Sequence, residues 1–167
     1  HVNSPGIFEY PLGTPLKEIL DAAGGVKGKL KGIIAGGLSV AILTADEAED
    51  LILDFDSRVK AGTALGSGGI MVVNDTVSIP ELALRTIRFY HHESCGQCVP
   101  CREGSRVIEN KLQGLIEGRG KMEDIDLILS LCENIKGLTL CPTGEAFSVP
   151  VEAMVRKFRT EFEELVR

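Results

Sequence analysis

Residues 92–104 read HESCGQCVPCREG, and this stretch places Cys95, Cys98 and Cys101 in a C-x-x-C-x-x-C spacing. A further cysteine, Cys141, follows much later and has Pro142 directly behind it. Three thiolates at two-residue intervals, with a remote fourth beside a proline, are spaced to hold the corners of one 4Fe-4S cube. We therefore predict these four cysteines as the ligands of an iron-sulfur cluster.

Two other uses of the same cysteines stay open. Four thiolates also suit a structural zinc ion, although such an ion is more often held by two separated C-x-x-C pairs. A disulfide framework is typical of small secreted proteins, whereas this sequence has an ordinary apolar content and an odd total of five cysteines. The spacing of the triplet favours iron and sulfide over either alternative.

The fifth cysteine, Cys132, has a different sequence environment. It lies in DIDLILSLCENI, residues 124–135, where Ile125, Ile128 and Ile135 recur at helical spacing. A cysteine on the apolar face of a helix behaves as a small hydrophobic residue. We predict that Cys132 is buried in the core and is not a ligand.

The overall composition limits the classes of protein to which this chain can belong. The chain has 167 residues, of which 44% are hydrophobic and 25% charged, so it can form one domain or two small ones. A net charge of -6 argues against nucleic acid as a partner, because binding to phosphates needs a basic surface. No apolar stretch approaches the roughly 18 residues of a spanning helix, and HVNSPGIFEY at the start lacks the pattern of a signal peptide. We expect a soluble, cytoplasmic protein without membrane insertion.

The composition changes near residue 80, which predicts two domains, 1–79 and 80–167. The first holds the short β-type runs, which are GIIAGG (32–37), SVAIL (39–43) and GGIMVV (68–73). Before them, the segment from Ile7 to Tyr10 predicts a strand, and Thr14 is expected to cap a helix with Pro15 at its first position. Strands mixed with a helix in this way indicate an α+β domain.

Glycine clusters in the first domain were compared with phosphate-binding motifs. Neither GSGGIM (66–71) nor GGVKGKL (24–30) completes a nucleotide-binding pattern. We therefore expect these glycines in turns and at close contacts between backbone segments.

The second domain is predicted to be a bundle of four helices. These are ELALRTIRFYHH (81–92), REGSRVIENKLQGLIEG (102–118), the helix that carries Cys132, and VPVEAMVRKFRTEFEELVR (149–167). Connections of modest length favour a small bundle. The cysteine triplet precedes the second helix and Cys141 precedes the fourth, so both cysteine loops are expected at one end.

Polar groups of two kinds flank the cysteines. Backbone N–H groups around residues 101–103, at the start of a helix, are expected to point towards the cluster sulfurs. The ionisable neighbours are His91, His92, Glu93, Arg102, Arg106 and Glu145. The arginines can balance the negative charge of a cluster, whereas the histidines are interpreted as structural or supporting residues. The glutamates are the weakest candidates for coupling protonation to redox chemistry.

The string HESCGQCVPCREG closely resembles the cluster motif in the flavoprotein subunit of NADH:quinone oxidoreductase, respiratory complex I. LCPTGEA (140–146) is similar to the fourth-ligand segment of that family. PGIFEYPLGTPLKEILDAAGG (5–25) and KAGTALGSGGIMV (60–72) resemble its soluble-ligand-binding β-grasp domain. The resemblance covers essentially the whole chain and corresponds to the C-terminal part of that subunit.

The resemblance implies a fold and a ligand set. The fold would be α+β, with a small β-grasp, ubiquitin-like domain over 1–79, truncated at its N-terminus, and a four-helix bundle carrying the cluster over 80–167. The four predicted cysteines fall on the ligand positions of the family. FMN and NAD are expected only in an N-terminal domain that this sequence lacks, so the chain alone is not expected to oxidise NADH.

The resemblance also implies a role in electron transfer. Electrons would pass from FMN through the cluster to other iron-sulfur subunits of the same redox complex. The parent enzyme would be the quinone oxidoreductase, or a hydrogenase or formate dehydrogenase with a related diaphorase subunit. Such a protein would lie in the cytoplasm, or peripherally on the cytoplasmic or matrix side of an energy-transducing membrane. An interaction module stabilised by zinc, without redox function, is the alternative of another class.

Overall fold

The structure is a computed structural model and describes residues 1–166. The chain divides into two compact units, an N-terminal unit from His1 to Val77 and a helical unit from Ser78 to Arg167. The sequence placed the division between residues 79 and 80. The mixture of a β-sheet with helices confirms the expected α+β class.

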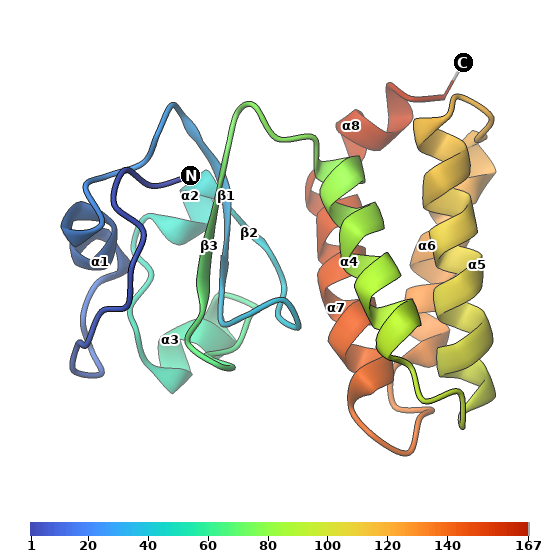
Figure 1. Ribbon diagram of the computed structural model, residues 1–167, viewed down its shortest axis with the longest axis horizontal. Helices are drawn as coiled ribbons and strands as arrows, with labels where there is room; N and C mark the ends of the chain where they lie inside the picture. Colours follow the sequence, from blue (N-terminus) through green and yellow to red (C-terminus); the bar gives the residue numbers. More distant parts are fainter. Residues whose placement is uncertain (167) are drawn as a thin grey trace. The chain divides into compact units, whose positions relative to one another are not determined.

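The N-terminal unit is built on a three-stranded antiparallel sheet (Figure 1). The strands are β1 (Leu30–Ala35), β2 (Leu43–Thr44) and β3 (Ile70–Asn74), in the order β2-β1-β3. Three short helices belong to the same unit, α1 (Leu16–Ala22), α2 (Ala45–Ala48) and α3 (Phe55–Lys60). Buried side chains from the sheet and from α1 and α2 form one core, which contains Leu16, Ile33, Ala35, Leu43, Ala48, Leu51 and Val72.

Three sequence predictions for this unit are wrong in detail. The segment from Ile7 to Tyr10 is not a strand, and Ile7 and Phe8 are exposed. Thr14 does not cap α1, because its hydroxyl donates to the carbonyl of Pro11 at 2.8 Å and Pro15 occupies the N-cap position. In SVAIL the apolar residues 40–43 are buried while Ser39 is exposed, and only the last residue belongs to a strand. Apolar runs predict burial well, whereas strand pairing depends on distant partners.

The glycines near the sheet confirm the expectation of close backbone contacts. Gly66 has a φ of 50°, and a Cβ atom placed on it would lie 2.0 Å from the carbonyl oxygen of Gly36. A real Cβ cannot approach so closely, so only a glycine at position 66 allows the backbones of the two loops to meet here. Ser67 completes the contact with a hydrogen bond from its N–H to the same oxygen at 2.9 Å.

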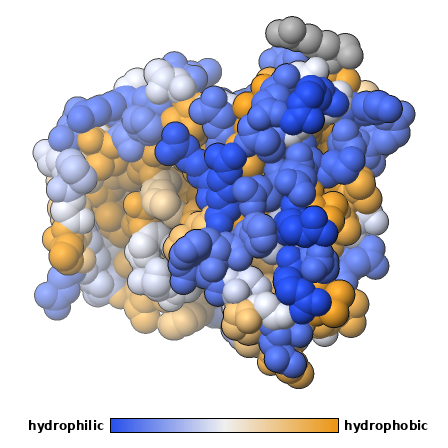
Figure 2. Space-filling view, turned by 45° about the vertical axis from the view of Figure 1, so that its right-hand side comes forward, coloured by the Kyte–Doolittle hydropathy of each residue, from blue (hydrophilic) through white to orange (hydrophobic). Residues whose placement is uncertain are grey.

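Over its described residues, 78–166, the helical unit contains four long helices and one short one. They are α4 (Ile79–Glu93), α5 (Val99–Ile116), α6 (Met122–Ile135), α7 (Thr143–Lys157) and α8 (Arg159–Glu163). Each long helix packs against the next along the chain, and α7 also packs against α4 (Figure 1). On the face shown in Figure 2, this unit is covered largely by hydrophilic residues. The apolar faces therefore turn inward, as the helical periodicity predicts.

The buried faces and the start of α4 follow the sequence signals. Ser78 begins α4 by accepting a hydrogen bond from the N–H of Glu81, and Pro80 stands in the first turn. The core is drawn from all five helices and includes Ile87, Ile108, Leu112, Ile125, Ile128, Cys132, Phe147, Val151, Met154 and Phe162. The prediction that Cys132 is a core residue is confirmed, because it is 0% exposed.

The last predicted helix is wrong in its bounds. The sequence placed one helix over 149–167, whereas α7 already begins at Thr143 and a break at Phe158 separates it from α8. Phe158 leaves helical geometry with φ -120° and ψ 31°. Pro150, the second residue of the predicted helix, lies inside α7 at a buried position. The earlier start matters for function, because it brings the beginning of α7 next to Cys141.

Candidate metal centre

The two cysteine loops lie at the same end of the helical unit (Figure 1). One loop joins α4 to α5 and carries Cys95 and Cys98, while the other joins α6 to α7 and carries Cys141. The loops touch, because the N–H of Leu140 donates a hydrogen bond to the Sγ of Cys98 at 3.4 Å. Segments far apart in sequence are thus neighbours at the cysteines.

The first loop is shaped by a short set of backbone contacts. Gly96 has a φ of 78°, which a side chain would strain, and its N–H donates to the hydroxyl of Ser94 at 3.3 Å. Cys98 is the N-cap residue of α5, and its carbonyl accepts from the N–H of Arg102 at 2.9 Å. The guanidinium of Arg102 also donates to the carbonyl of Gly96. These bonds turn the chain directly from the loop into α5.

The three cysteines of the triplet differ in burial. Cys95 is exposed, Cys98 is half-buried, and Cys101 is 6% exposed within the first turn of α5. The Sγ of Cys101 lies 3.3 Å from the hydroxyl of Ser94. Within residues 1–166, no three side chains of His, Cys, Asp or Glu are grouped as a site for a metal ion.

The second loop holds Cys141 beside the start of α7. Gly137 turns the chain with a φ of 74°, and its N–H donates to Glu145 at 3.1 Å. The hydroxyl of Thr139 donates to the carbonyl of Cys141 at 2.8 Å. The Sγ of Cys141 lies 3.3 Å from the hydroxyl of Thr143. This hydroxyl, together with the N–H of Thr143, lowers the pKa of the Cys141 thiol and so favours the thiolate.

Two glycines allow the helices to approach behind the cysteines. A Cβ atom on Gly104 of α5 would lie 2.4 Å from the Cδ1 of Ile135, the last residue of α6. A Cβ atom on Gly144 of α7 would lie 2.7 Å from Thr139 and 3.1 Å from Ile135. Helices α5 and α7 therefore both close upon the end of α6. This packing positions the loop of Cys141 next to the triplet.

The two predicted cations, Arg102 and Arg106, both pair with a neighbouring carboxylate. Arg102 donates to Glu103 at 3.3 Å and Arg106 donates to it at 2.7 Å. Bonds from Arg106 and then Arg102 lower the pKa of Glu103. The positive charge near the triplet is thus shared with Glu103 on the surface of α5.

The prediction for backbone donors at the start of α5 is wrong in part. The N–H of Arg102 is bonded to the carbonyl of Cys98 and is not directed at sulfur. The N–H groups in the first turn of a helix have no intrahelical partners. In α5 these are the N–H groups of Val99 and Cys101, because Pro100 has no N–H.

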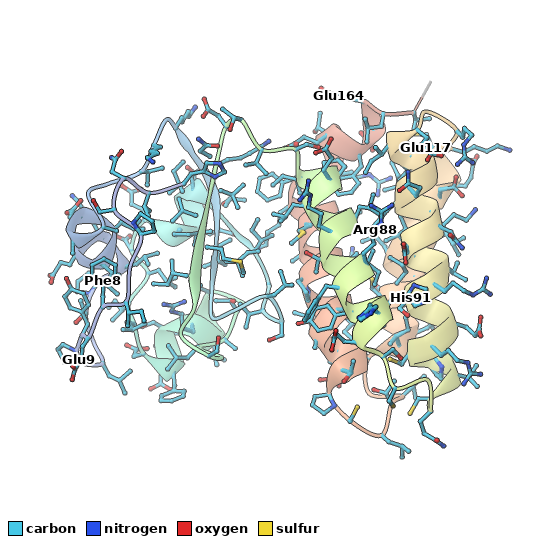
Figure 3. All side chains as sticks on the ribbon, in the orientation of Figure 1. Phe8, Glu9, Arg88, His91, Glu117 and Glu164 are labelled. Atoms are coloured by element: carbon cyan, nitrogen blue, oxygen red, sulfur yellow. The ribbon has the colours of Figure 1, made fainter. Side chains whose placement is uncertain are left out.

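The histidine interpretation agrees with the contacts of His91. Its Nδ1 lies 2.6 Å from Glu109 of α5, which also pairs with Arg88 at 3.3 Å. Arg88 and His91 both come from α4 (Figure 3). The pair stabilises the packing of α4 on α5. His92 is exposed and contacts Glu93 at 3.0 Å.

Sequence reasoning missed the residues that contact the sulfurs. Ser94, Thr143 and the N–H of Leu140 each lie within hydrogen-bonding reach of a cysteine. Ser94 precedes Cys95 directly and Thr143 follows Cys141 by two positions, so hydroxyl residues beside ligand cysteines were the available signal. The contact of Leu140 had no such signal, because it depends on the approach of two loops.

A hollow that does not involve the cysteines is found in the N-terminal unit. It has a volume of about 1040 Å³ and is formed wholly by residues of the N-terminal unit, among them Phe8, Ile19 and Met71. No cysteine lines it. Among the helices of residues 1–166, none combines the length and the apolar character that a membrane-spanning segment needs.

Comparison with known families agrees with this geometry. Residues 81–165, which include the four predicted ligand cysteines, match the NADH-ubiquinone oxidoreductase-F iron-sulfur binding region. The chain belongs to this family. Residues 1–40 of the same chain match the SLBB domain.

Individual relatives cover the whole chain. The F subunit of NADH-quinone oxidoreductase from Rickettsia bellii is 42% identical, with 100% of this chain and 41% of that protein aligned. The F 2 subunit of the same enzyme from Rhizobium meliloti is 39% identical, over 96% of this chain and 39% of that protein. The chain therefore spans about two fifths of the length of these curated relatives.

A solved structure shares the fold. The NAD+-reducing [NiFe]-hydrogenase in its H2-reduced state superposes with a TM-score of 0.88 at 25% sequence identity. The match covers 99% of this chain and 28% of that hydrogenase chain. This chain and that part of the hydrogenase chain thus share one arrangement of these elements.

Proposed function

We propose that this chain is the electron-transfer portion of an NADH-oxidising flavoprotein subunit, in which Cys95, Cys98, Cys101 and Cys141 hold one 4Fe-4S cluster. The observation that carries the proposal is the meeting of the two cysteine loops at one end of the helical unit, through the bond from Leu140 to Cys98. Membership of an iron-sulfur binding family supports it independently.

The donor set is chemically suited to such a cluster. Thiolates are the usual ligands of iron-sulfur clusters, and contacts at Cys141 already favour the deprotonated sulfur. Bound there, a 4Fe-4S cluster supplies single-electron transfer. The residues of this chain hold it, donate hydrogen bonds to its ligand sulfurs and shield one side, since Cys101 is buried while Cys95 and Cys141 face outward.

The rest of the pathway lies outside these residues. We propose that hydride is taken from NADH by FMN in another part of the longer subunit, and that electrons then cross this segment to a partner iron-sulfur subunit. Apolar side chains beside the cysteines support a partner surface, since Val99, Leu138 and Leu140 are 59%, 64% and 86% exposed. A peripheral position on the cytoplasmic or matrix side of a membrane follows for a complex that reduces quinone.

The second candidate is the diaphorase subunit of an NAD-linked hydrogenase or a related enzyme. It is favoured by the structural match to the NAD+-reducing [NiFe]-hydrogenase. Both candidates use the same cysteines in the same way. They differ in the partner that receives or supplies the electrons, so purification of the native complex and identification of its other subunits separates them.

Metal analysis tests the ligand set directly. After anaerobic purification of the chain, we expect about four irons and four sulfides per chain and an EPR signal after reduction with dithionite. Replacement of Cys98 by Ala should abolish both, while replacement of Cys132 by Ala should leave them. One zinc per chain without sulfide would refute the redox proposal and support a zinc-stabilised interaction module.

A further inference from the structure

We propose that the hydroxyl groups of Ser94 and Thr143 raise the reduction potential of the cluster by donating hydrogen bonds to the sulfurs of Cys101 and Cys141. The inference rests on the proposed function, because it takes these cysteines as thiolate ligands. It assigns a role to two residues that are not ligands themselves.

The direction of the first bond follows from the other contact of Ser94. Its Oγ accepts a hydrogen bond from the N–H of Gly96 at 3.3 Å and lies 3.3 Å from the Sγ of Cys101. A hydroxyl has one hydrogen to donate, and a thiolate has none. When Cys101 binds iron as a thiolate, the bond therefore runs from Ser94 to the sulfur. Ser94 ends α4 in an extended conformation, which keeps this hydroxyl turned back towards α5.

Thr143 makes the equivalent contact on the other loop. Its Oγ1 lies 3.3 Å from the Sγ of Cys141, at the first position of α7. A thiol at Cys141 donates to this oxygen, whereas a thiolate accepts from it, so the hydrogen bond reverses when the cysteine becomes a ligand. The third contact, from the N–H of Leu140 to Cys98, comes from the backbone and stays when the side chain of Leu140 is changed.

The effect on the potential follows from the charge of the cluster. Each electron that the cluster gains makes it more negative, and part of this charge resides on the ligand sulfurs. A hydrogen bond to a charged acceptor is stronger than one to a neutral acceptor, so each donor stabilises the reduced state more than the oxidised state. Loss of a donor therefore lowers the potential.

The two hydroxyls are expected to change the reduction potential by different amounts. Cys101 is 6% exposed, whereas Cys141 is exposed to solvent. Water can replace a lost donor at Cys141 but has little access to Cys101, and a hydrogen bond counts for more where water is excluded. We expect Ser94→Ala to change the ratio of reduced to oxidised cluster about tenfold, which equals about 59 mV for one electron. Thr143→Val should change it in the same direction by a smaller factor.

The experiment is a potentiometric titration of the reconstituted 167-residue chain, followed by EPR. The test variants are Ser94→Ala and Thr143→Val, and Ser94→Thr and Thr143→Ser retain the hydroxyls. Two control variants remove hydroxyls that contact no cysteine. Thr86→Val removes a buried hydroxyl that donates to the carbonyl of Leu82 at 2.9 Å, and Ser130→Ala removes an exposed one on α6.

We expect lower potentials in the two test variants, near-parental potentials in the hydroxyl-retaining variants, and no change in the controls. An unchanged potential in Ser94→Ala at full iron content would overturn the inference, as would an equal fall in Ser94→Thr. If Ser94→Ala does not retain iron, the potential of Thr143→Val alone tests the inference, because Thr143 contacts Cys141 on the other loop. Failure of the proposed function is distinguishable, since the parental chain would then contain no iron and sulfide.

Discussion

Replacement of Gly144 by Ala tests whether close helix packing positions the fourth cysteine. The new Cβ would lie 2.7 Å from both the Cγ2 and the Oγ1 of Thr139, and 3.1 Å from the Cγ2 of Ile135. Real Cβ atoms essentially never come within 3.0 Å of a heavy atom outside their own residue and its chain neighbours. Both neighbours are β-branched and stiff at χ1, so neither can turn away easily. Rotation of Thr139 would also break its bond to the carbonyl of Cys141.

The loop of Cys141 must therefore shift, and the shift has a cost. Overpacking of this kind destabilises proteins by about 1–3 kcal/mol. For a unit of this size each 1 kcal/mol corresponds to about 4–8 °C in Tm, so we expect a fall of at least about 4 °C in Gly144→Ala. The displaced cysteine should also lower the retention of iron.

Gly114 provides the matched control. It lies inside α5, and a Cβ placed on it meets no heavy atom within 4 Å beyond its chain neighbours and the adjacent backbone of its own helix. Gly114→Ala should stabilise the helix by up to about 1 kcal/mol, because alanine has the higher helix propensity. Urea denaturation followed by circular dichroism, together with iron content after gel filtration, compares the two variants. Equal stability and equal iron in Gly144→Ala and the parent would refute the packing argument.

Three further results are expected. Burial raises the pKa of Cys132 to about 12, so the neutral thiol stabilises the folded state at neutral pH and this contribution is lost as pH rises from about 9 towards 12. Cys132→Ala should show a smaller loss of stability over that range in urea denaturation, and an equal loss would contradict the assignment. A bond from Lys111, and then one from the N–H of Lys121, lower the pKa of Asp124. The carboxylate of Asp124 stabilises the fold above about pH 4, and this contribution is lost as the pH falls through the lower native pKa. Asp124→Asn should therefore be about 1 kcal/mol less stable than the parent at pH 7 and should approach the parent near pH 2. Identical stabilities at pH 7 would argue against this role of Asp124. The isolated chain should not oxidise NADH with ferricyanide as acceptor, and turnover would show that a flavin site lies within these 167 residues.

Much of the helical unit could be predicted because its signals are local. The repeat of Ile125, Ile128 and Cys132 predicts a buried helical face, and the structure buries all three. The periodicity of the apolar residues indicates which face of a helix turns inward, whatever element packs against that face. It indicates the bounds of a helix less well, since the predicted start at residue 149 lies inside α7. The start at Thr143 is set together with the loop that carries Cys141.

The N-terminal unit was less predictable because strands depend on distant partners. Residues 7–10 have the composition of a strand but no described strand pairs with them, while residues 40–42 are apolar and buried without joining the sheet. Hydrophobic content predicts removal from water, whereas a strand also needs a neighbour with free N–H and C=O groups.

The sequence by itself determined which residues are proposed as iron ligands, because the spacing of Cys95, Cys98 and Cys101 and the proline after Cys141 are properties of the chain alone. The tertiary structure decided how the two loops meet and which groups contact the sulfurs. Gly104 and Gly144 allow α5 and α7 to close on Ile135, and that approach brings Leu140 to Cys98. A contact between residues so far apart in the chain is set by helix packing, which depends on all the helices at once and has no local pattern in the sequence.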